Sequence, residues 1–170
     1  DGRWMPVACD VLRHYFQYSA RIGYAVMLTE PARILDVGCA KGFLVDDLHR
    51  CSARADAYGI DISRYAVVEQ PYPDVAGRLH LGTADELSFP DKSFDLVLSI
   101  NTLHNLPRPR LGRALQEMRR VSRGGMFVQV DSYRTPEEKA ALEDWVLTAE
   151  THGPPEFWLA LFAEAGYDGD

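Results

Sequence analysis

One nine-residue segment constrains the fold of this chain more than any other feature. It reads Ile34-Leu35-Asp36-Val37-Gly38-Cys39-Ala40-Lys41-Gly42, an apolar run that ends in an acid and is followed by a turn of small residues. The run favours a strand, and residues 43–49 after the turn carry an apolar stripe at helical spacing. Small residues let the backbone approach a ligand closely, and the start of a helix leaves N–H groups unpaired. We therefore expect a strand–turn–helix unit that binds an anionic group.

The remaining chain repeats this alternation of strand and helix. Further strands are predicted at residues 57–60, 79–82, 94–100 and 126–130, and further helices at 63–69, 111–121, 135–149 and 155–165. The run from Phe94 to Ile100 is apolar enough for a central strand covered on both faces. Gly124 and Gly125 are expected to end the helix before them, while Thr135, Pro136 and Glu138 form an N-terminal capping pattern. The pattern predicts a doubly wound α/β fold with a mostly parallel sheet, helices on both faces and a ligand site at the carboxyl ends of the strands.

The length predicts one domain over residues 1–170. Within it, residues 1–30 show helical apolar spacing and are expected to form an N-terminal helical cap. Tyr15 and Tyr18 of this cap are candidates to line an acceptor pocket, although packing in the core explains helical aromatics more often. Residues 31–170 then form the α/β core. The chain begins without Met and ends at Asp170 where another strand could begin, so we expect terminal strands of the sheet to lie outside it.

Composition and net charge narrow the classes of molecule that this chain is expected to bind. The formal net charge of −7 would repel a polyphosphate backbone, so no nucleic-acid partner is expected. The sequence contains no apolar stretch of roughly 20 residues and no signal-peptide pattern at its start, so we expect a cytoplasmic protein that binds no membrane. Its three cysteines, Cys9, Cys39 and Cys51, form no CxxC pair, which disfavours disulfides and structural zinc. A small molecule is the expected substrate.

Two kinds of ligand satisfy the first turn and its acid. A dinucleotide would place its pyrophosphate on the helix N-terminus, but the usual G-x-G-x-x-G spacing is replaced by G-x-x-x-G with Ala40 between the glycines. A zwitterionic ligand would place its carboxylate there and its ammonium group beside Asp36. Asp61 follows the second strand about 20 residues later, where an acid accepts ribose hydroxyls in either case.

Several segments together resemble one family. Asp36 to Gly42 is similar to the D/E-x-G-x-G-x-G motif of the class I, Rossmann-like methyltransferases, with Ala40 in place of the middle glycine. Residues 81–90 resemble the segment that lies along the adenine ring in that family, and residues 89–99 resemble its approach to the fourth strand. The resemblance implies an S-adenosylmethionine-dependent enzyme of the small-molecule type, which moves the sulfonium methyl group to an O, N or C atom and releases S-adenosylhomocysteine.

The resemblance also implies roles for individual residues. The methionyl portion would be surrounded by Asp36, Gly38, Cys39, Ala40 and Gly42, and the ribose would be bound by Asp61 with Ile62 beside it. The adenine amine would donate to Asp85, with Ala84 and Glu86 bordering the ring and the Ser99 backbone closing the site.

The acceptor side carries weaker signals. His104 is the candidate general base, because an imidazole titrates near neutral pH and can take a proton from an acceptor hydroxyl; packing on the cofactor is the plainer interpretation. Asn101 and Asp131 follow strands from which some relatives hold magnesium, but the rest of that ligand set is missing, so no metal is predicted. His152 lies in a loop that could reach the cleft. An arginine cluster could attract an anionic acceptor, although a solvated helix face explains it better; it comprises Arg108, Arg110, Arg113, Arg119, Arg120 and Arg123.

Two other functions fit parts of the pattern. An NAD-dependent oxidoreductase would share Asp61 but not the glycine spacing or the adenine segment. A non-catalytic regulatory module would keep the fold and bind S-adenosylmethionine without transferring the methyl group. The chain has no N/D-P-P-Y motif after the fourth strand and no cysteine in a Pro-Cys setting, which disfavours methylation of nucleobases.

Overall fold

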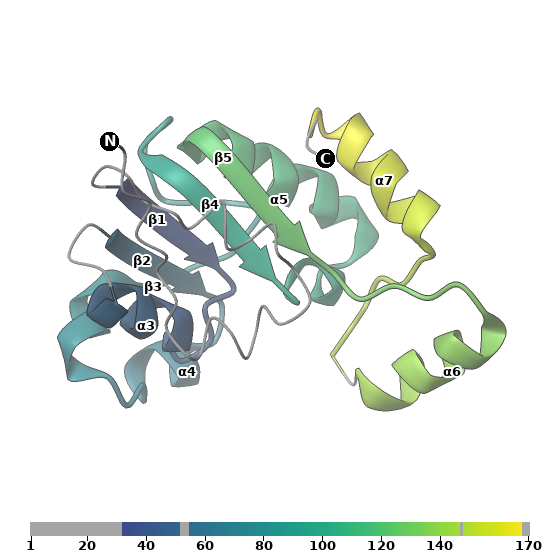
Figure 1. Ribbon diagram of the computed structural model, residues 1–170, viewed down its shortest axis with the longest axis horizontal. Helices are drawn as coiled ribbons and strands as arrows, with labels where there is room; N and C mark the ends of the chain where they lie inside the picture. Colours follow the sequence, from purple (N-terminus) through teal and green to yellow (C-terminus); the bar gives the residue numbers. More distant parts are fainter. Residues whose placement is uncertain (1–31, 52–54, 147, 168–170) are drawn as a thin grey trace, which may run out of the picture.

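The computed structural model describes residues 32–51, 55–146 and 148–167, so the predicted N-terminal cap with Tyr15 and Tyr18 lies outside the described residues. Its centre is a five-stranded sheet in the order β3-β2-β1-β4-β5, and every pairing is parallel (Figure 1). The strands are β1 (Ala32–Val37), β2 (Ala55–Asp61), β3 (Leu79–Leu81), β4 (Phe94–Ile100) and β5 (Ser122–Gln129). This architecture confirms the predicted doubly wound α/β fold.

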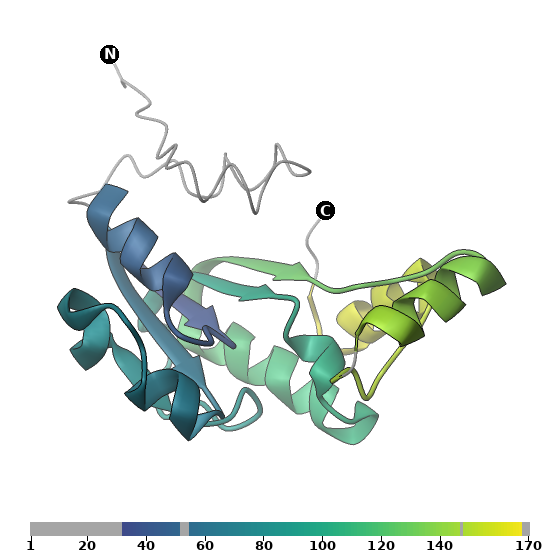
Figure 2. The same ribbon diagram turned by 90° about the horizontal axis from the view of Figure 1, so that it is seen from below.

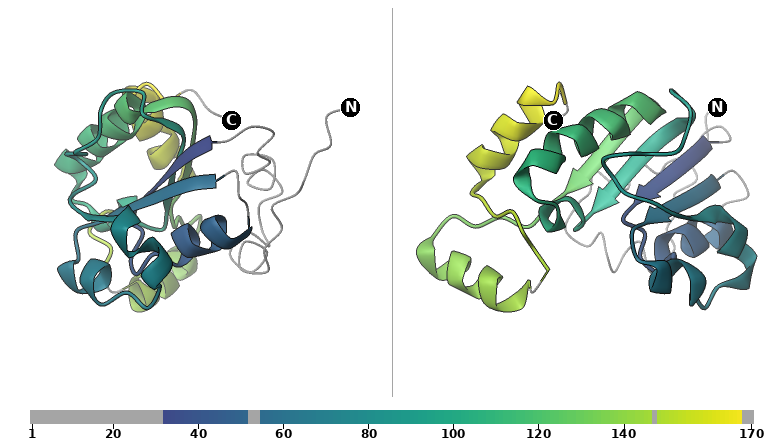
Figure 3. Two further views of the ribbon diagram at one scale, coloured as in Figure 1. Left: turned by 90° about the vertical axis from the view of Figure 1, so that its left-hand side faces the viewer. Right: turned by 180° about the vertical axis from the view of Figure 1, so that it is seen from behind.

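Helices connect the strands and cover the sheet. They are α3 (Phe43–Cys51), α4 (Arg64–Val68), α5 (Arg108–Val121), α6 (Pro136–Trp145) and α7 (Pro155–Glu164), with 3₁₀ turns η1 (Pro73–Arg78) and η2 (Leu103–Asn105). Figures 2 and 3 show α3 and α5 on opposite faces of the sheet, with α7 beside α5. Within the described residues, no helix combines the length and apolarity required to cross a membrane.

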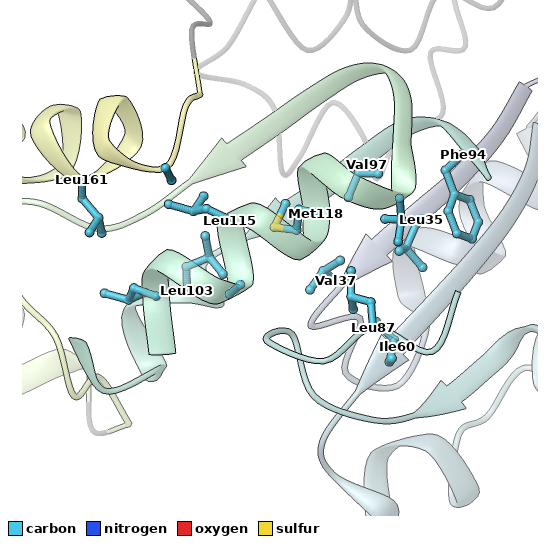
Figure 4. Close-up of a cluster of buried hydrophobic side chains, with 14 of the residues drawn as sticks. Leu35, Val37, Ile60, Leu87, Phe94, Val97, Leu103, Leu115, Met118 and Leu161 are labelled. Carbon is cyan, nitrogen blue, oxygen red and sulfur yellow. The ribbon is translucent and has the colours of Figure 1, made fainter. Parts of the chain in front are cut away.

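Alternating side chains of the strands build two cores, one on each face. Leu35 and Val37 of β1 join Val97, Met118 and further residues of α5 and α7 in one cluster (Figure 4). The residues between them in sequence, such as Ile34, pack with α3 on the other face. Since successive strand residues point to opposite faces, the central strands β1 and β4 are buried on both sides, and the carboxyl-end edge of the sheet carries the loops.

Two predicted boundaries were wrong. Gly124 and Gly125 do not separate helix from strand: α5 ends at Val121, and both glycines lie within β5. A Cβ at Gly124 would collide with the carbonyl oxygen of Asp95, so this glycine permits close approach of β4 where the pairing register shifts. The helix predicted over 135–149 ends earlier, at Trp145.

The predicted start of α6 is confirmed. The hydroxyl of Thr135 accepts a hydrogen bond from the Glu138 amide at 3.2 Å, and the Glu138 carboxylate accepts one from the Arg134 amide at 2.6 Å. None of the α6 residues is buried, and Figure 1 shows the helix standing away from the sheet. Local capping, not burial, therefore defines where this helix begins.

Candidate functional site

The carboxyl ends of β1, β2 and β4 meet at two adjoining cavities. One of about 150 Å³ is lined by Asp36, Gly38, Cys39, Ala40, Phe43, Leu44 and Ile100. The other, of about 550 Å³, shares Gly38, Ala40 and Ile100 with the first and adds the following groups: Asp61, Ile62, Thr83, Asn101, Thr102, Asn105, Leu106, Pro107, Arg110 and Glu150. We call the two together the groove. The structure thus brings together most of the residues predicted around the methionyl portion and the ribose.

The turn after β1 is shaped by three left-handed residues at alternate positions. Gly38, Ala40 and Gly42 have φ angles of 85°, 47° and 80°. A Cβ at Gly38 would collide with the Thr102 side chain, and one at Gly42 would lie 2.7 Å from Leu79 Cδ1. The amides of Gly38 and Cys39 donate to the Ile60 carbonyl at 2.8 and 3.2 Å, which ties the turn to β2. Ala40 holds a conformation that disfavours a side chain, so the middle position of this motif is strained here.

Asp36 is a buried carboxylate at one end of the groove. Only 6% of its surface is exposed, and no basic side chain among the described residues forms an ion pair with it. Burial, and then the negative charge of Asp61, raise the pKa of Asp36 to about 7. A cationic group in the adjoining cavity would remove this electrostatic cost, so the environment fits the ammonium group of a methionyl ligand.

Asp61 lies at the end of β2 and is held by backbone amides. Its Oδ2 accepts from the Ala40 amide at 2.8 Å and its Oδ1 accepts from the Ser63 amide at 2.8 Å. Each carboxylate oxygen has a further lone pair, so the group can also accept from a vicinal diol. Ile62, next to it, is 68% exposed and lines the same cavity. Together with Asp36, this pair of carboxylate acceptors fits the ammonium group and the ribose hydroxyls of S-adenosylmethionine.

Asp85 is buried and is not among the residues that line the groove, and its role at the adenine stays a prediction. Its carboxylate accepts from Arg110 Nε at 2.6 Å and from Arg110 Nη2 at 2.5 Å, and this bonding lowers the pKa of Asp85 to about 2. The cavity lining at this end contains Thr83 and Arg110, whereas Ala84, Asp85 and Glu86 are absent from it. Sequence reasoning missed Thr83; its signal was its place directly after β3 and Gly82.

Ser99 lies inside β4 and is fully buried. The β4 residues that line the groove are Ile100 and then Asn101 just beyond the strand end, so a role for the Ser99 backbone stays a prediction. Asn101 has a φ of 52°, and its side-chain oxygen accepts from Gln129 Nε2 at 3.2 Å. Asparagine tolerates this left-handed conformation better than most residues, which turns the chain sharply at the groove.

His104 is buried in η2, beside the groove. Its Nδ1 accepts from the Asp131 amide at 3.4 Å and lies 3.7 Å from Asp131 Oδ2. Burial lowers the pKa of His104 below its ordinary value, so the ring is neutral at pH 7. His152 Nε2 lies 3.1 Å from the Ala149 carbonyl oxygen, and neither histidine is among the lining residues. A catalytic role for His104 stays a prediction.

The predicted arginine cluster is largely exposed, as expected for a solvated face, but several of its members also form specific contacts. Arg110 binds Asp85, Arg120 binds Glu117 and Asp91, and Arg123 binds Asp95. Arg108 lies over the Phe157 ring, with 4.9 Å between its Cζ and the ring centroid. The pairs of Arg110 with Asp85 and of Arg120 with Asp91 join α5 to the loop between β3 and β4. In the part of the chain that the structure describes, no three His, Cys, Asp or Glu side chains gather to hold a metal ion.

Comparison with known proteins identifies the family of this chain. Residues 35–129 match the family model of a methyltransferase domain. A fatty-acid O-methyltransferase from Mycolicibacterium smegmatis is 36% identical over 121 residues, which cover 68% of this chain and 43% of that protein. A ubiquinone biosynthesis O-methyltransferase from Azorhizobium caulinodans is 35% identical over 101 residues, covering 57% of this chain and 38% of that protein. The chain therefore spans less than half the length of either relative.

Solved structures share the fold. The crystal structure of a SAM-dependent methyltransferase from Archaeoglobus fulgidus superposes with a TM-score of 0.67 at 18% identity, covering 92% of this chain and 66% of that one. A crystal structure described as a putative methyltransferase from Bacillus halodurans gives a TM-score of 0.69 at 17% identity, covering 93% and 69%. At such identities the likeness concerns the arrangement of strands and helices.

Proposed function

This chain belongs to the methyltransferase domain family, and on that premise we propose that it moves a methyl group from S-adenosylmethionine to an O, N or C atom of a small-molecule acceptor. The observation that carries the proposal is the groove itself. It joins a buried carboxylate without a cationic partner among the described residues, Asp36, to a second acid held by backbone amides, Asp61. These two acids lie at the carboxyl ends of neighbouring parallel strands, where open α/β sheets bind their ligands.

The proposed roles of the residues follow from their contacts. Asp36 receives the ammonium group, the turn from Gly38 to Gly42 lies against the methionyl chain, and Asp61 accepts from the ribose hydroxyls. When bound, the cofactor supplies a methyl group activated by its positive sulfur. Methyl transfer is a displacement, so the contribution of the groove is to hold two reactants in line and to exclude water.

The acceptor is proposed from the relatives. Two of them are named as O-methyltransferases, one of fatty acids and one of ubiquinone biosynthesis. We propose a small organic acceptor and would test hydroxyl and carboxyl oxygens first. The net charge of −7 argues against a polyanionic acceptor such as nucleic acid.

Binding of S-adenosylhomocysteine is the first test. We expect calorimetry to show saturable binding by the wild-type chain and no binding of NADH at the same concentration. Asp61→Ala should weaken that binding because it removes the ribose acceptor, whereas Asp74→Ala, an exposed acid outside the groove, should not. Failure of the wild-type chain to bind S-adenosylhomocysteine or S-adenosylmethionine would refute the proposal. Binding with no methyl transfer to any acceptor of a broad panel would favour the regulatory module.

His104 is our candidate general base, and its substitution separates chemistry from binding. We expect His104→Gln to lower kcat by about 100-fold with a hydroxyl acceptor, the scale of general-base catalysis. The Kd of S-adenosylhomocysteine should stay unchanged, because the residues proposed to hold it are Asp36, Asp61 and the turn from Gly38 to Gly42, whereas His104 bonds to Asp131. Initial rates over a pH series provide the measurement, with His152→Gln as the control. Wild-type turnover in His104→Gln would exclude the role.

A further inference from the structure

A further cavity lies at the opposite edge of the sheet from the groove, where β4 and β5 begin and α5 and α7 end (Figure 1). Its volume is about 560 Å³, and three of its lining side chains, those of Lys92, Arg119 and Arg123, carry a positive charge. None of the described residues that line it is acidic, although the whole chain has a formal net charge of −7. We call it the cationic cavity. A concentration of one sign of charge in a cavity favours the binding of an anion.

Two of the three cations have no carboxylate partner in the described part of the chain. Arg123 Nε lies 2.7 Å from Asp95 Oδ1. Lys92 and Arg119 take part in none of the ion pairs between described residues. Arg119 lies in the last turn of α5, where a cation complements the helix dipole. That effect does not explain the cluster, because Lys92 lies in the turn before β4 and Arg123 lies in β5.

The backbone holds Lys92 and Arg119 at the cavity. Lys92 has a φ of 50°, in the left-handed region that glycine and asparagine adopt most easily, and its amide donates to the Arg120 carbonyl at 2.8 Å. Gly166 has a φ of 74°, and a Cβ there would collide with Arg119 Nη1, so this glycine makes room for the guanidinium group. Strained residues gather at functional sites. Lysine supplies a positive charge at a position that glycine or asparagine would fill with less strain.

Two backbone acceptors at the cavity are already bonded within the protein. The Gly125 carbonyl oxygen accepts from Ser122 Oγ at 3.1 Å. The Met126 carbonyl oxygen accepts from Tyr167 Oη at 3.1 Å. All four of these residues line the cationic cavity. The hydrogen bonds occupy oxygens that would otherwise repel an anion, whereas the charged N–H groups of Lys92 and Arg119 have no such partner among the described residues.

We propose that the cationic cavity binds the phosphate group of a small molecule, at a site separate from the groove. A phosphate monoester carries about 1.5 to 2 negative charges near pH 7 and presents three strong acceptor oxygens. It can therefore bond to one ammonium and two guanidinium groups at once, whereas a carboxylate has two oxygens and a single charge. Because the cavity and the groove lie at opposite edges of the sheet, this inference does not depend on the proposed function.

Titration of the whole chain with inorganic phosphate at about pH 8 tests the site. Calorimetry follows the binding, with sodium chloride adjusted to keep the ionic strength constant. We expect saturable binding with a Kd of about 1 mM or lower, and a matching rise in Tm because the ligand binds the folded state. Arg119→Gln should weaken the binding by about tenfold. Arg119→Lys should weaken it less, since lysine keeps the charge but not the planar fork.

Lys92→Asn separates binding from folding. Asparagine adopts the left-handed conformation more easily than lysine, so the stability of this variant in urea should equal or exceed that of the wild type. Its affinity for phosphate should nevertheless fall by about tenfold, because one of the three charges is lost. A lysine with a purely structural role would not lower the affinity while the stability is maintained.

A matched control distinguishes a site from a general effect of charge. Arg113→Gln removes a positive charge from the exposed face of α5, outside the cationic cavity, and should leave the affinity for phosphate unchanged. A loss as large as that in Arg119→Gln would show that phosphate responds to net charge alone, and would overturn the inference. Wild-type affinity in both Arg119→Gln and Lys92→Asn would overturn it as well.

The remaining outcomes concern the source of the phosphate group and the groove. A wild-type chain that does not bind inorganic phosphate overturns the inference. This holds also if the chain binds vesicles of phosphatidylcholine and phosphatidic acid, because the cations would then serve a lipid headgroup. Binding of S-adenosylhomocysteine should be unchanged in Arg119→Gln and Lys92→Asn. Phosphate binding that depends on Lys92 and Arg119, but not on Arg113, supports the inference.

Discussion

Asp36→Asn is expected to make the protein more stable at about pH 8 while weakening its binding of S-adenosylhomocysteine. Asp36 is buried, and its pKa of about 7 means that the folded protein must ionise an unpaired carboxylate inside the groove above that pH. Asparagine has nearly the same shape and carries no charge. The gain in the free energy of unfolding is up to about 4 kcal/mol, or roughly 8–16 °C in Tm.

The sign follows from the two pKa values of Asp36. The ordinary pKa is 3.8 and the folded value is about 7, so between them the folded state keeps a proton that the unfolded state has lost. The contribution of Asp36 to stability therefore falls as pH rises through this range and stays low above it. Asp36→Asn should accordingly match the wild type near pH 4 and exceed it increasingly up to about pH 7. Thermal unfolding followed by circular dichroism across this range measures the difference.

Ligand binding by the wild type should change in the opposite direction with pH. A cationic ammonium group beside Asp36 favours its ionised form, so binding below about pH 7 must first remove a proton from the carboxyl group. The affinity for S-adenosylhomocysteine should fall by up to about tenfold per pH unit below that value. In Asp36→Asn the affinity should be lower by about 10- to 100-fold near pH 7.5 and nearly independent of pH, because the charge-assisted bond is lost.

A control variant, together with the stability and affinity of Asp36→Asn, tests whether Asp36 causes these effects of pH. Asp74→Asn removes an exposed acid and should change neither stability nor affinity by a comparable amount. A variant Asp36→Asn that is less stable than the wild type near pH 8, or that binds the ligand with wild-type affinity and pH dependence, would contradict this account. We expect Asp36 to lower the stability of the ligand-free protein, because its cationic partner is present only when the ligand is bound.

The sheet could be predicted from sequence because its signals are local. Apolar runs marked β1, β2 and β4, and burial on both faces explains why the runs of β1 and β4 are so continuous. Gly124 and Gly125 were misassigned because their role is not local. The need for a glycine comes from the carbonyl oxygen of Asp95 on the neighbouring strand, which no pattern along the chain reveals.

The residues of the candidate site also differ in whether a local sequence pattern could predict their place. Asp36 and Asp61 lie at the carboxyl ends of β1 and β2, so the parallel topology brings them to one groove, and the sequence was sufficient to predict their meeting. Asp85 was predicted as a base contact from the family resemblance of residues 81–90; in the structure its carboxylate pairs with Arg110, 25 positions away, and Thr83 lines the cavity. A pattern along the chain does not reveal a long-range ion pair of this kind.

Gly38→Ala is expected to destabilise the protein by about 2–5 kcal/mol, a large share of the stability of a typical domain. Two effects combine at this residue. Its φ of 85° is strained for any residue with a side chain, and the added Cβ would collide with the Thr102 side chain. Urea unfolding measures the loss, and calorimetry should show weaker S-adenosylhomocysteine binding, because the turn that moves lines both cavities of the groove.

Two companion variants separate the causes. Gly112→Ala adds the same methyl group to α5, where a Cβ meets nothing within 4 Å, so it should stabilise the helix by about 0.5–1 kcal/mol. Thr102→Ala combined with Gly38→Ala should recover only part of the loss, since it makes room but leaves the φ strain. Wild-type stability and affinity in Gly38→Ala would contradict both effects. The Gly38 amide also donates to the Ile60 carbonyl at 2.8 Å, so the turn is held between β2 and the Thr102 loop after β4. The groove keeps its shape only while the turn, β2 and this loop stay in place.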